Sequence, residues 1–119
     1  MKYALLVYGD QSAWAALDAA EAARLRAESR PGWNAVFEEL GTVDPSWDGR
    51  ELAPASEAKV VRVRDGNQIV TDGPFADTKE QIGGLFVTEL ADLDEAIRIA
   101  ALIPSAARGT IEIRPLVEH

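Results

Sequence analysis

The sequence contains no cysteine and a single histidine, and these two shortages exclude several kinds of chemistry. Without cysteine, the chain has no disulfide, no thiolate nucleophile, no zinc–thiolate site and no iron–sulfur cluster. The one histidine, His119, is the last residue, where chains usually fray, so no internal imidazole is present as a general base or a haem ligand. The carboxylates are not spaced like a calcium loop, and no glycine pattern follows a strand as in a dinucleotide site. The sequence therefore predicts no metal and no cofactor.

Long hydrophobic runs and an excess of positive charge are also missing. No apolar run is long enough to cross a bilayer, and the apolar run at residues 3–8 is too short for a signal-peptide core. The net charge of −8 gives a surface that repels phosphate backbones and anionic lipid heads. We therefore expect a cytoplasmic protein that binds neither nucleic acid nor membrane directly.

The length and composition are those of a globular protein with one core. The chain has 119 residues, and 47% of them are hydrophobic. Two separate domains would each be too small to bury a core of their own. We expect one domain over residues 1–119.

Five short segments have the composition of β-strands: residues 3–8, 61–64, 68–71, 85–90 and 110–114. The first and fourth of these are apolar on both faces, which is typical of central strands. The second and third flank Asp65-Gly66, a strong turn signal, and are predicted to form a hairpin. The last alternates apolar and polar residues up to Pro115, which favours an edge strand.

Two helical segments are predicted between the first strand and the hairpin. Residues 11–29 are rich in good helix formers and are interrupted by Pro31-Gly32. Residues 33–40 then place apolar side chains on one face of a second short helix that Gly41 can cap.

A last helix is predicted from its capping residues. Asp92 is a suitable N-cap, Glu95 its capping-box partner, and the helix is expected to end at Pro104. The polar segments 42–55 and 72–83 contain glycine and proline and are predicted to be loops.

This order of elements predicts a ferredoxin-like βαββαβ sheet of the α+β class. The first and third strands of that fold are the central ones, which suits the two segments that are apolar on both faces, residues 3–8 and 85–90. Both helices must then cross the same face of the sheet. The other face has no cover from the same chain, and packing it against the same face of a second copy is the simplest way to bury it. We therefore expect a homodimer.

The most specific motif is the run T-D-G-P-F-A-D-T-K-E-Q-I-G-G at residues 71–84. It resembles the DGPF motif of the YCII-related (DGPF-domain) proteins. The resemblance extends over nearly the whole chain: residues 2–10 are similar to the opening strand of that family, 62–65 to its hairpin, and 92–104 and 112–115 to its closing helix and strand.

The resemblance implies a dimeric α+β barrel, in agreement with the fold expected from the residue patterns. It implies less about function. Some similar domains accompany extracytoplasmic-function sigma factors. A few relatives resemble enzymes that act on small ring-derived acids with a His-Asp pair between sheet and helices. This sequence departs from that pattern, because its one histidine is His119.

Asp72 is the candidate catalytic residue, since it ends a strand and begins the motif loop. Buried beside Phe75, it would serve as an acid or base; alternatively, it caps the amides near Gly73 in an Asx-turn. Gly73 with Pro74 sets the backbone of the loop, and Phe75 is expected to anchor it.

The other candidate ligand-binding residues are Tyr8, Thr78 and Lys79. Thr78 and Lys79 belong to a polar cluster in which Lys79 can hold a carboxylate or phosphate, although an exposed ion pair is an equal alternative. Tyr8 lies near the first strand–helix junction, where it lines either a pocket with Phe75 or the ordinary core.

Three functions remain open at this point. The first is a homodimer that binds a small molecule in the sheet–helix cleft near the motif loop, in a regulatory role. The second is a histidine-free enzyme acting on a small polar or ring-derived acid, with Asp72 as acid or base and Lys79 as anion holder. The third, suggested by the resemblance alone, is a protein-interaction module linked to sigma-factor regulation.

Overall fold

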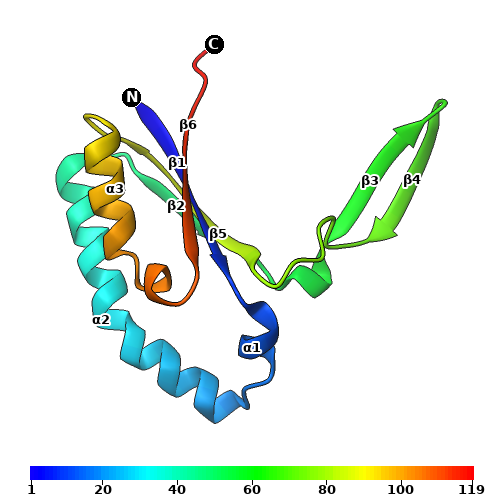
Figure 1. Cartoon of the computed structure of the whole chain (residues 1–119), viewed down its shortest axis with the longest axis horizontal. Helices are drawn as coiled ribbons and strands as arrows, with labels where there is room; N and C mark the ends of the chain where they lie inside the picture. Colours follow the sequence, from blue (N-terminus) through cyan, green and yellow to red (C-terminus); the bar gives the residue numbers. More distant parts are fainter.

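The chain folds around a four-stranded antiparallel sheet (Figure 1). The computed structural model describes residues 1–119. In sheet order the strands are β2 (Asp48–Glu51), β5 (Gln81–Glu89), β1 (Lys2–Gly9) and β6 (Thr110–Pro115). The two strands predicted to be central, β1 and β5, are confirmed in the centre, where neighbouring strands cover both of their edges.

Two helices cover one face of the sheet, as predicted (Figure 1). They are α2 (Ala19–Val43) and α3 (Leu93–Leu102). Side chains alternate along β1, so Tyr3, Leu5 and Val7 point to the helices and are buried there. The strand order and the one-sided helix layer are compatible with the predicted ferredoxin-like α+β fold. The core consists of Tyr3, Leu5, Val7, Val36, Leu40, Phe86, Leu90, Ala96, Ile99 and Ile103.

The two helices predicted at residues 11–29 and 33–40 are wrong in their boundaries. The structure has a short helix, α1 (Gln11–Ala15), and then one continuous helix, α2, which runs through Pro31. Asp18 starts α2, because its carboxylate accepts a hydrogen bond from the Glu21 amide at 2.8 Å. Burial of Val36 and Leu40 anchors the part of α2 after Pro31, so packing outweighs the local cost of the proline.

The ends of the helices depend on acidic residues. The expected cap at Gly41 is wrong, since α2 continues to Val43 and Asp44 is its C-cap. The start of α3 is confirmed: Asp92 accepts from the Glu95 amide at 2.9 Å, while the Glu95 carboxylate accepts from the Ala91 amide at 2.8 Å. The predicted stop at Pro104 is also confirmed, because α3 ends two residues before it and a 3₁₀ helix, η2 (Pro104–Ala107), follows.

The predicted loop at 42–55 contains a strand that the sequence does not indicate. β2 consists of Asp48, Gly49, Arg50 and Glu51, which are poor strand formers, and it is a strand because it pairs with β5. Gly49 permits this pairing at Phe86, since a Cβ at Gly49 would lie 2.9 Å from the phenylalanine ring.

The predicted hairpin is confirmed, but it lies outside the main sheet. β3 (Lys59–Arg64) and β4 (Asn67–Asp72) pair only with each other, and Asp65 and Gly66 form the turn at positive φ. A short 3₁₀ helix, η1 (Ala55–Glu57), precedes the hairpin, and β5 begins at Gln81, so the last three residues of the predicted loop 72–83 belong to the strand. We call residues 59–72 the arm.

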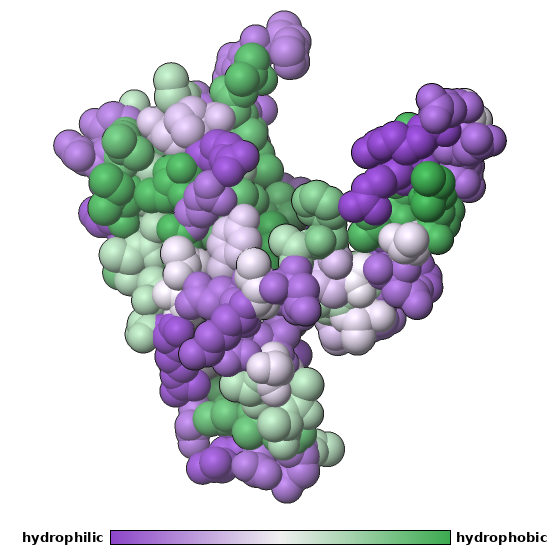
Figure 2. Space-filling view, turned by 45° about the vertical axis from the view of Figure 1, so that its right-hand side comes forward, coloured by the Kyte–Doolittle hydropathy of each residue, from purple (hydrophilic) through white to green (hydrophobic).

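The arm gives the molecule an open shape. Figure 1 shows α2 and α3 on one side of the sheet and the arm projecting from the other, and Figure 2 shows it standing apart from the body. The radius of gyration is 16.4 Å, whereas a compact chain of this length has about 13 to 14 Å. None of the helices combines the length and apolar character that a membrane crossing requires.

Candidate binding site

The structure divides the predicted site residues between two places. Asp72, Gly73 and Phe75 lie at the base of the arm, whereas Tyr8 lies near the end of β1 in the main sheet. The loop of residues 73–80 leads from the first place to the second. The six residues therefore do not line one pocket.

At the base of the arm, Asp72 is exposed. Its side chain retains 83% of its accessible surface and forms an ion pair with Lys59 across the hairpin. Phe75 is 77% exposed, and the Arg62 guanidinium lies 5.4 Å from its ring centre. The expectation that Asp72 is buried beside Phe75, and that Phe75 anchors the loop in the core, is therefore wrong.

Gly73 has a clear structural role at the same base. Its amide donates to the Ala58 carbonyl at 2.8 Å, and a Cβ at this position would lie 2.8 Å from the Ala58 Cβ. The glycine thus allows β4 to end against the residue that precedes β3.

The second half of the loop is attached to the end of the main sheet. The Thr78 hydroxyl donates to the Glu80 carbonyl at 2.6 Å, and the Gln81 side-chain amide donates to the Thr78 carbonyl at 2.8 Å. The Thr110 hydroxyl of β6 donates to the Glu80 carboxylate at 2.8 Å. Because Thr110 is the β-sheet partner of Tyr8, these bonds hold the loop beside the end of β1.

Lys79 lies in this attached part of the loop. It is exposed and takes part in none of the ion pairs of the molecule. The hydrogen bonds from the Ser12 hydroxyl and the Ala13 amide are the main causes that lower the pKa of Asp10, and the charge of Lys79 makes a smaller contribution. Lys79 is thus a cation near the end of β1 that forms no ion pair with a carboxylate.

Tyr8 begins a polar array on the face of the sheet that the helices leave open. Its hydroxyl donates to Oε1 of Glu112 at 3.2 Å, and Oε2 of Glu112 accepts from the Arg114 guanidinium at 2.6 Å. Alternation along β1 and β6 places all three side chains on the face opposite to Leu5 and Val7. Sequence reasoning did not select Glu112 or Arg114 as site residues; their i, i+2 spacing on one strand face was the available signal.

The protonation of this array follows from its contacts. Burial raises the pKa of the Tyr8 phenol, and the hydrogen bond to Glu112 raises it further. The hydrogen bonds from Arg114 and Tyr8 lower the pKa of the Glu112 carboxyl. At neutral pH the array therefore presents a phenol, a carboxylate and a guanidinium, and the Arg114 side chain is 66% exposed.

An apolar strip lies beside the array on the same face. Leu6 pairs with Leu85 and Ala4 pairs with Val87, so these four side chains occupy the centre of the two middle strands. Asp48 and Arg50 form an ion pair on the β2 side of the strip, and Glu112 and Arg114 do so on the β6 side. We call this surface the open face.

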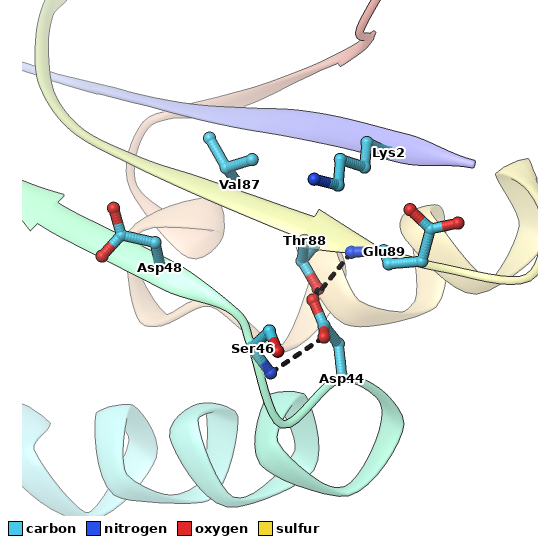
Figure 3. A pocket seen from close by; sticks show the side chains of 7 residues that line it. All are labelled: Lys2, Asp44, Ser46, Asp48, Val87, Thr88 and Glu89. Atoms are coloured by element: carbon cyan, nitrogen blue, oxygen red, sulfur yellow. Dashed lines mark hydrogen bonds between the residues drawn. The ribbon is translucent and has the colours of Figure 1, made fainter. Parts of the chain in front are cut away.

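A hollow of about 550 Å³ lies where β2 meets β5, and its lining groups mostly satisfy one another (Figure 3). The Asp44 carboxylate accepts from the Ser46 amide at 2.9 Å, the Glu89 amide at 2.9 Å and the Thr88 hydroxyl at 3.2 Å. These hydrogen bonds lower the pKa of Asp44, the one from Glu89 most. Asp44 therefore has a structural role.

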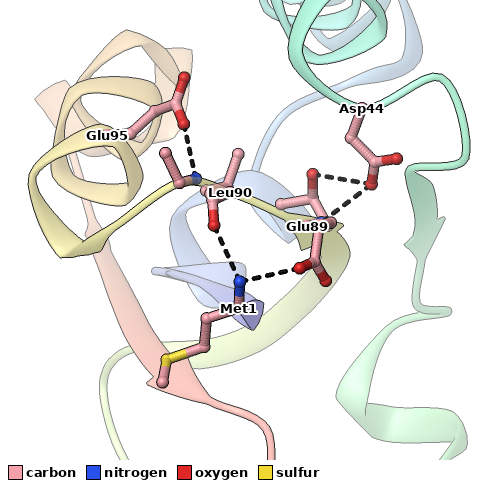
Figure 4. Close-up of polar contacts among 7 residues, drawn as sticks. Met1, Asp44, Glu89, Leu90 and Glu95 are labelled. Carbon is pink, nitrogen blue, oxygen red and sulfur yellow. Dashed lines mark hydrogen bonds and ion pairs between the residues drawn. The ribbon is translucent and has the colours of Figure 1, made fainter.

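The same region holds the first residue (Figure 4). The Met1 ammonium donates to Oε1 of Glu89 at 2.8 Å and to the Leu90 carbonyl at 3.1 Å. Together with Asp44, this arrangement ties the start of β1 and the end of α2 to the end of β5.

The helix side of the sheet offers little for a charged ligand. A shallow groove of about 240 Å³ lies between α3 and β6, and apolar side chains alone line it. No three His, Asp or Glu side chains gather as a metal site would require. The groups suited to a polar ligand are on the open face and in the adjoining loop.

Comparison with known proteins identifies the family. The model of the YCII-related domain matches residues 1–119. The chain is also 36% identical over 118 residues to an uncharacterised protein of Rhizobium meliloti (strain 1021), covering 98% of this chain and 92% of that protein. With the whole chain matched, the resemblance carried by the motif at residues 71–84 is confirmed, and the protein belongs to the YCII-related domain family.

Proposed function

We propose that the protein is a homodimer that binds a small molecule bearing a carboxylate or phosphate group at the end of the open face, and that it binds this molecule without transforming it. The observation that carries the proposal is the array of Tyr8, Glu112 and Arg114 on the open face, with the unpaired Lys79 in the loop that is attached at the Tyr8 end of β1. Two cations suit an anionic oxygen group.

The donors of the array support an anion rather than a cation. Glu112 already accepts from Tyr8 and Arg114, so part of its charge is compensated. The exposed guanidinium of Arg114 retains N–H groups for a ligand, and the Lys79 ammonium has no carboxylate within 4.0 Å.

Catalysis has less support than binding. Asp72 is exposed and paired with Lys59, so it lacks the secluded setting that acid–base work on a bound substrate needs. The one histidine lies at residue 119, outside the array. A regulatory role, in which ligand binding changes the stability of the dimer, agrees with these features.

The dimer part of the proposal rests on the open face. Leu6, Leu85 and Val87 lie on the side of the sheet that carries no helix, and a second open face would cover them. We expect sedimentation velocity to show a dimer at micromolar concentration and Leu6→Glu to dissociate it. A wild-type protein that is monomeric at this concentration contradicts the dimer.

The ligand part is tested by thermal shift with inorganic phosphate, pyrophosphate, succinate and benzoate. A ligand at a hundred times its dissociation constant adds about 2.7 kcal/mol to the stability of the folded state. We expect Arg114→Gln and Lys79→Gln to abolish the shift. The matched control is Arg30→Gln, because Arg30 is exposed on α2 and forms no ion pair.

Either of two outcomes contradicts the ligand proposal: no probe stabilises the protein, or Arg30→Gln weakens the shift as much as the site variants do. If a probe binds, nuclear magnetic resonance of the probe with stoichiometric protein tests for turnover. An unchanged probe is expected, and a new product would favour the enzyme alternative.

A further inference from the structure

The arm exposes apolar side chains that nothing in its own chain covers. The exposed fractions are 61% at Val61, 62% at Val63 and 52% at Val70. Val61 lies directly opposite Val70, and Val63 is on the same face of the hairpin. The other face carries Ile69, which is 42% exposed. Apolar residues on both faces of a two-stranded hairpin are unfavourable in water unless another surface covers them.

The arm also has a charge opposite to that of the body. Its 14 residues carry three basic and two acidic side chains, a net charge of +1, while the other 105 residues carry nine basic and 18 acidic ones, a net charge of −9. Arg62 and Arg64 take part in no ion pair of the molecule. A second copy of this chain therefore offers an acidic surface that complements the arm.

We propose that the arm is a clasp that packs its valine face against the body of a second copy of this chain. The inference rests on the proposed dimer and adds a second contact to it. In the dimer, the arm of each protomer covers its partner with Val61, Val63 and Val70, while Arg62 and Arg64, on the opposite face of the hairpin, add to the positive charge of the arm.

The placement of the arm favours a second copy over an unrelated protein. The arm projects from the side of the sheet opposite to the helices (Figure 1), and a gap separates it from the body in the space-filling view (Figure 2). A partner that enters this region to cover Leu6 and Leu85 comes within reach of the arm. One partner thus covers both apolar surfaces, and two-fold symmetry does the same for the other protomer.

The open face alone is small for a stable dimer interface. Four strands of this length have a projected area of about 400 Å², whereas a stable interface buries about 800 Å² of accessible surface on each partner. The apolar side chains of the arm, Phe75 at its base included, supply further contact surface.

The test compares Val70→Glu with Leu93→Glu, a control on α3 that is also 52% exposed. We expect sedimentation equilibrium to show that Val70→Glu raises the dissociation constant of the dimer at least tenfold. Leu93→Glu is expected to leave it within twofold of the wild-type value. Circular dichroism verifies that both variants retain the fold.

The second measurement is crosslinking through a single introduced cysteine, which can be labelled specifically because the chain has no cysteine of its own. Val63→Cys is labelled with a photo-crosslinker, and unlabelled and ¹⁵N-labelled copies are mixed and irradiated. We expect peptides that join the arm of a light chain to the body of a heavy chain. Crosslinks confined to one isotope would mean that the arm folds back on its own chain, which overturns the clasp.

The outcomes separate the clasp from the proposal on which it rests. A dimeric wild-type protein whose dissociation constant is unchanged by Val70→Glu overturns the clasp and leaves the open-face dimer standing. A monomeric wild-type protein overturns both. Binding of the anionic probes is measured independently and does not enter this comparison.

Discussion

The carboxylate of Asp44 accepts a hydrogen bond from the backbone amide of Glu89 at 2.9 Å, joining two residues 45 positions apart. Asp44 ends α2 and Glu89 ends β5, so this bond connects the helix layer to a central strand. The same carboxylate accepts from the Thr88 hydroxyl, which is buried, and from the Ser46 amide. One side chain therefore fixes the connection from α2 into β2.

We expect Asp44→Ala to lower the free energy of unfolding by about 1–2 kcal/mol, because three donors lose an ionised acceptor. Urea unfolding followed by circular dichroism measures this loss. The control is Asp48→Ala, since Asp48 lines the same hollow but pairs only with the exposed Arg50. Equal losses in the two variants would contradict the structural role of Asp44.

The stability of the protein should depend on pH through the Asp44 carboxylate. The pKa of Asp44 in the folded protein is lowered from its ordinary value of 3.8, the Glu89 hydrogen bond being the main cause. The unfolded chain therefore binds more protons near pH 4, so this contribution is present above that pH and is lost as the pH falls through the folded-state pKa. Asp44→Asn should be less stable than wild type at pH 7 and approach it at pH 3. A constant difference between pH 7 and pH 3 contradicts this assignment.

Much of the fold could be predicted because its signals are local. The apolar runs of β1 and β5, the Asp65-Gly66 turn and the Asp92–Glu95 cap each act within a few residues, and each is found in the structure. The continuous helix α2 could not be predicted from local propensity. The packing of Val36 and Leu40 against the sheet, which lies far away in sequence, carries the helix through Pro31.

The strand β2 and the candidate site could not be predicted for the same reason: both depend on contacts between residues that are far apart in the sequence. Asp48 to Glu51 form a strand through pairing with β5, more than 30 residues later in the chain. Tyr8 and Glu112 meet because β1 and β6 are neighbours, a contact across 104 positions that no spacing in the sequence encodes. The motif at residues 71–84 identified the family but pointed to Asp72, which the structure places at the exposed base of the arm.

Asp72→Asn is expected to leave both the stability and the probe binding of the protein unchanged, since the Asp72 side chain is exposed and its pair with Lys59 is solvated. Thermal unfolding and the thermal-shift screen measure the two properties. Loss of probe binding in Asp72→Asn, with stability retained, would place the ligand at the base of the arm and contradict the site proposed around Tyr8.

Glycine at position 109 is expected to be required where β6 approaches β1. A Cβ at Gly109 would lie 2.1 Å from the backbone oxygen of Tyr8, so one of the two strands must shift. We expect Gly109→Ala to cost more than about 2 kcal/mol of stability. Gly9→Ala is the matched control, because a Cβ at Gly9 meets nothing within 4 Å, and a change within about 0.5 kcal/mol is expected there. Equal stability of the two variants would show that β6 does not approach β1 this closely.

The variant Tyr8→Phe should identify the titration of the Tyr8 phenol. Burial first, and then the Glu112 hydrogen bond, raise the pKa of Tyr8 above its ordinary value of 10.0. The folded protein therefore holds this proton more tightly than the unfolded chain, and the resulting stability is present below pH 10 and lost as the pH rises through the folded-state pKa. Absorbance of tyrosinate during titration should show a step above pH 10 that is absent in Tyr8→Phe. Glu112→Gln should move that step toward pH 10 while burial keeps it above, because the carboxylate supplies the second cause of the shift. If the step that Tyr8→Phe removes lies at pH 10 in the wild-type protein, the contact between Tyr8 and Glu112 is contradicted, and with it the array on which the binding proposal rests.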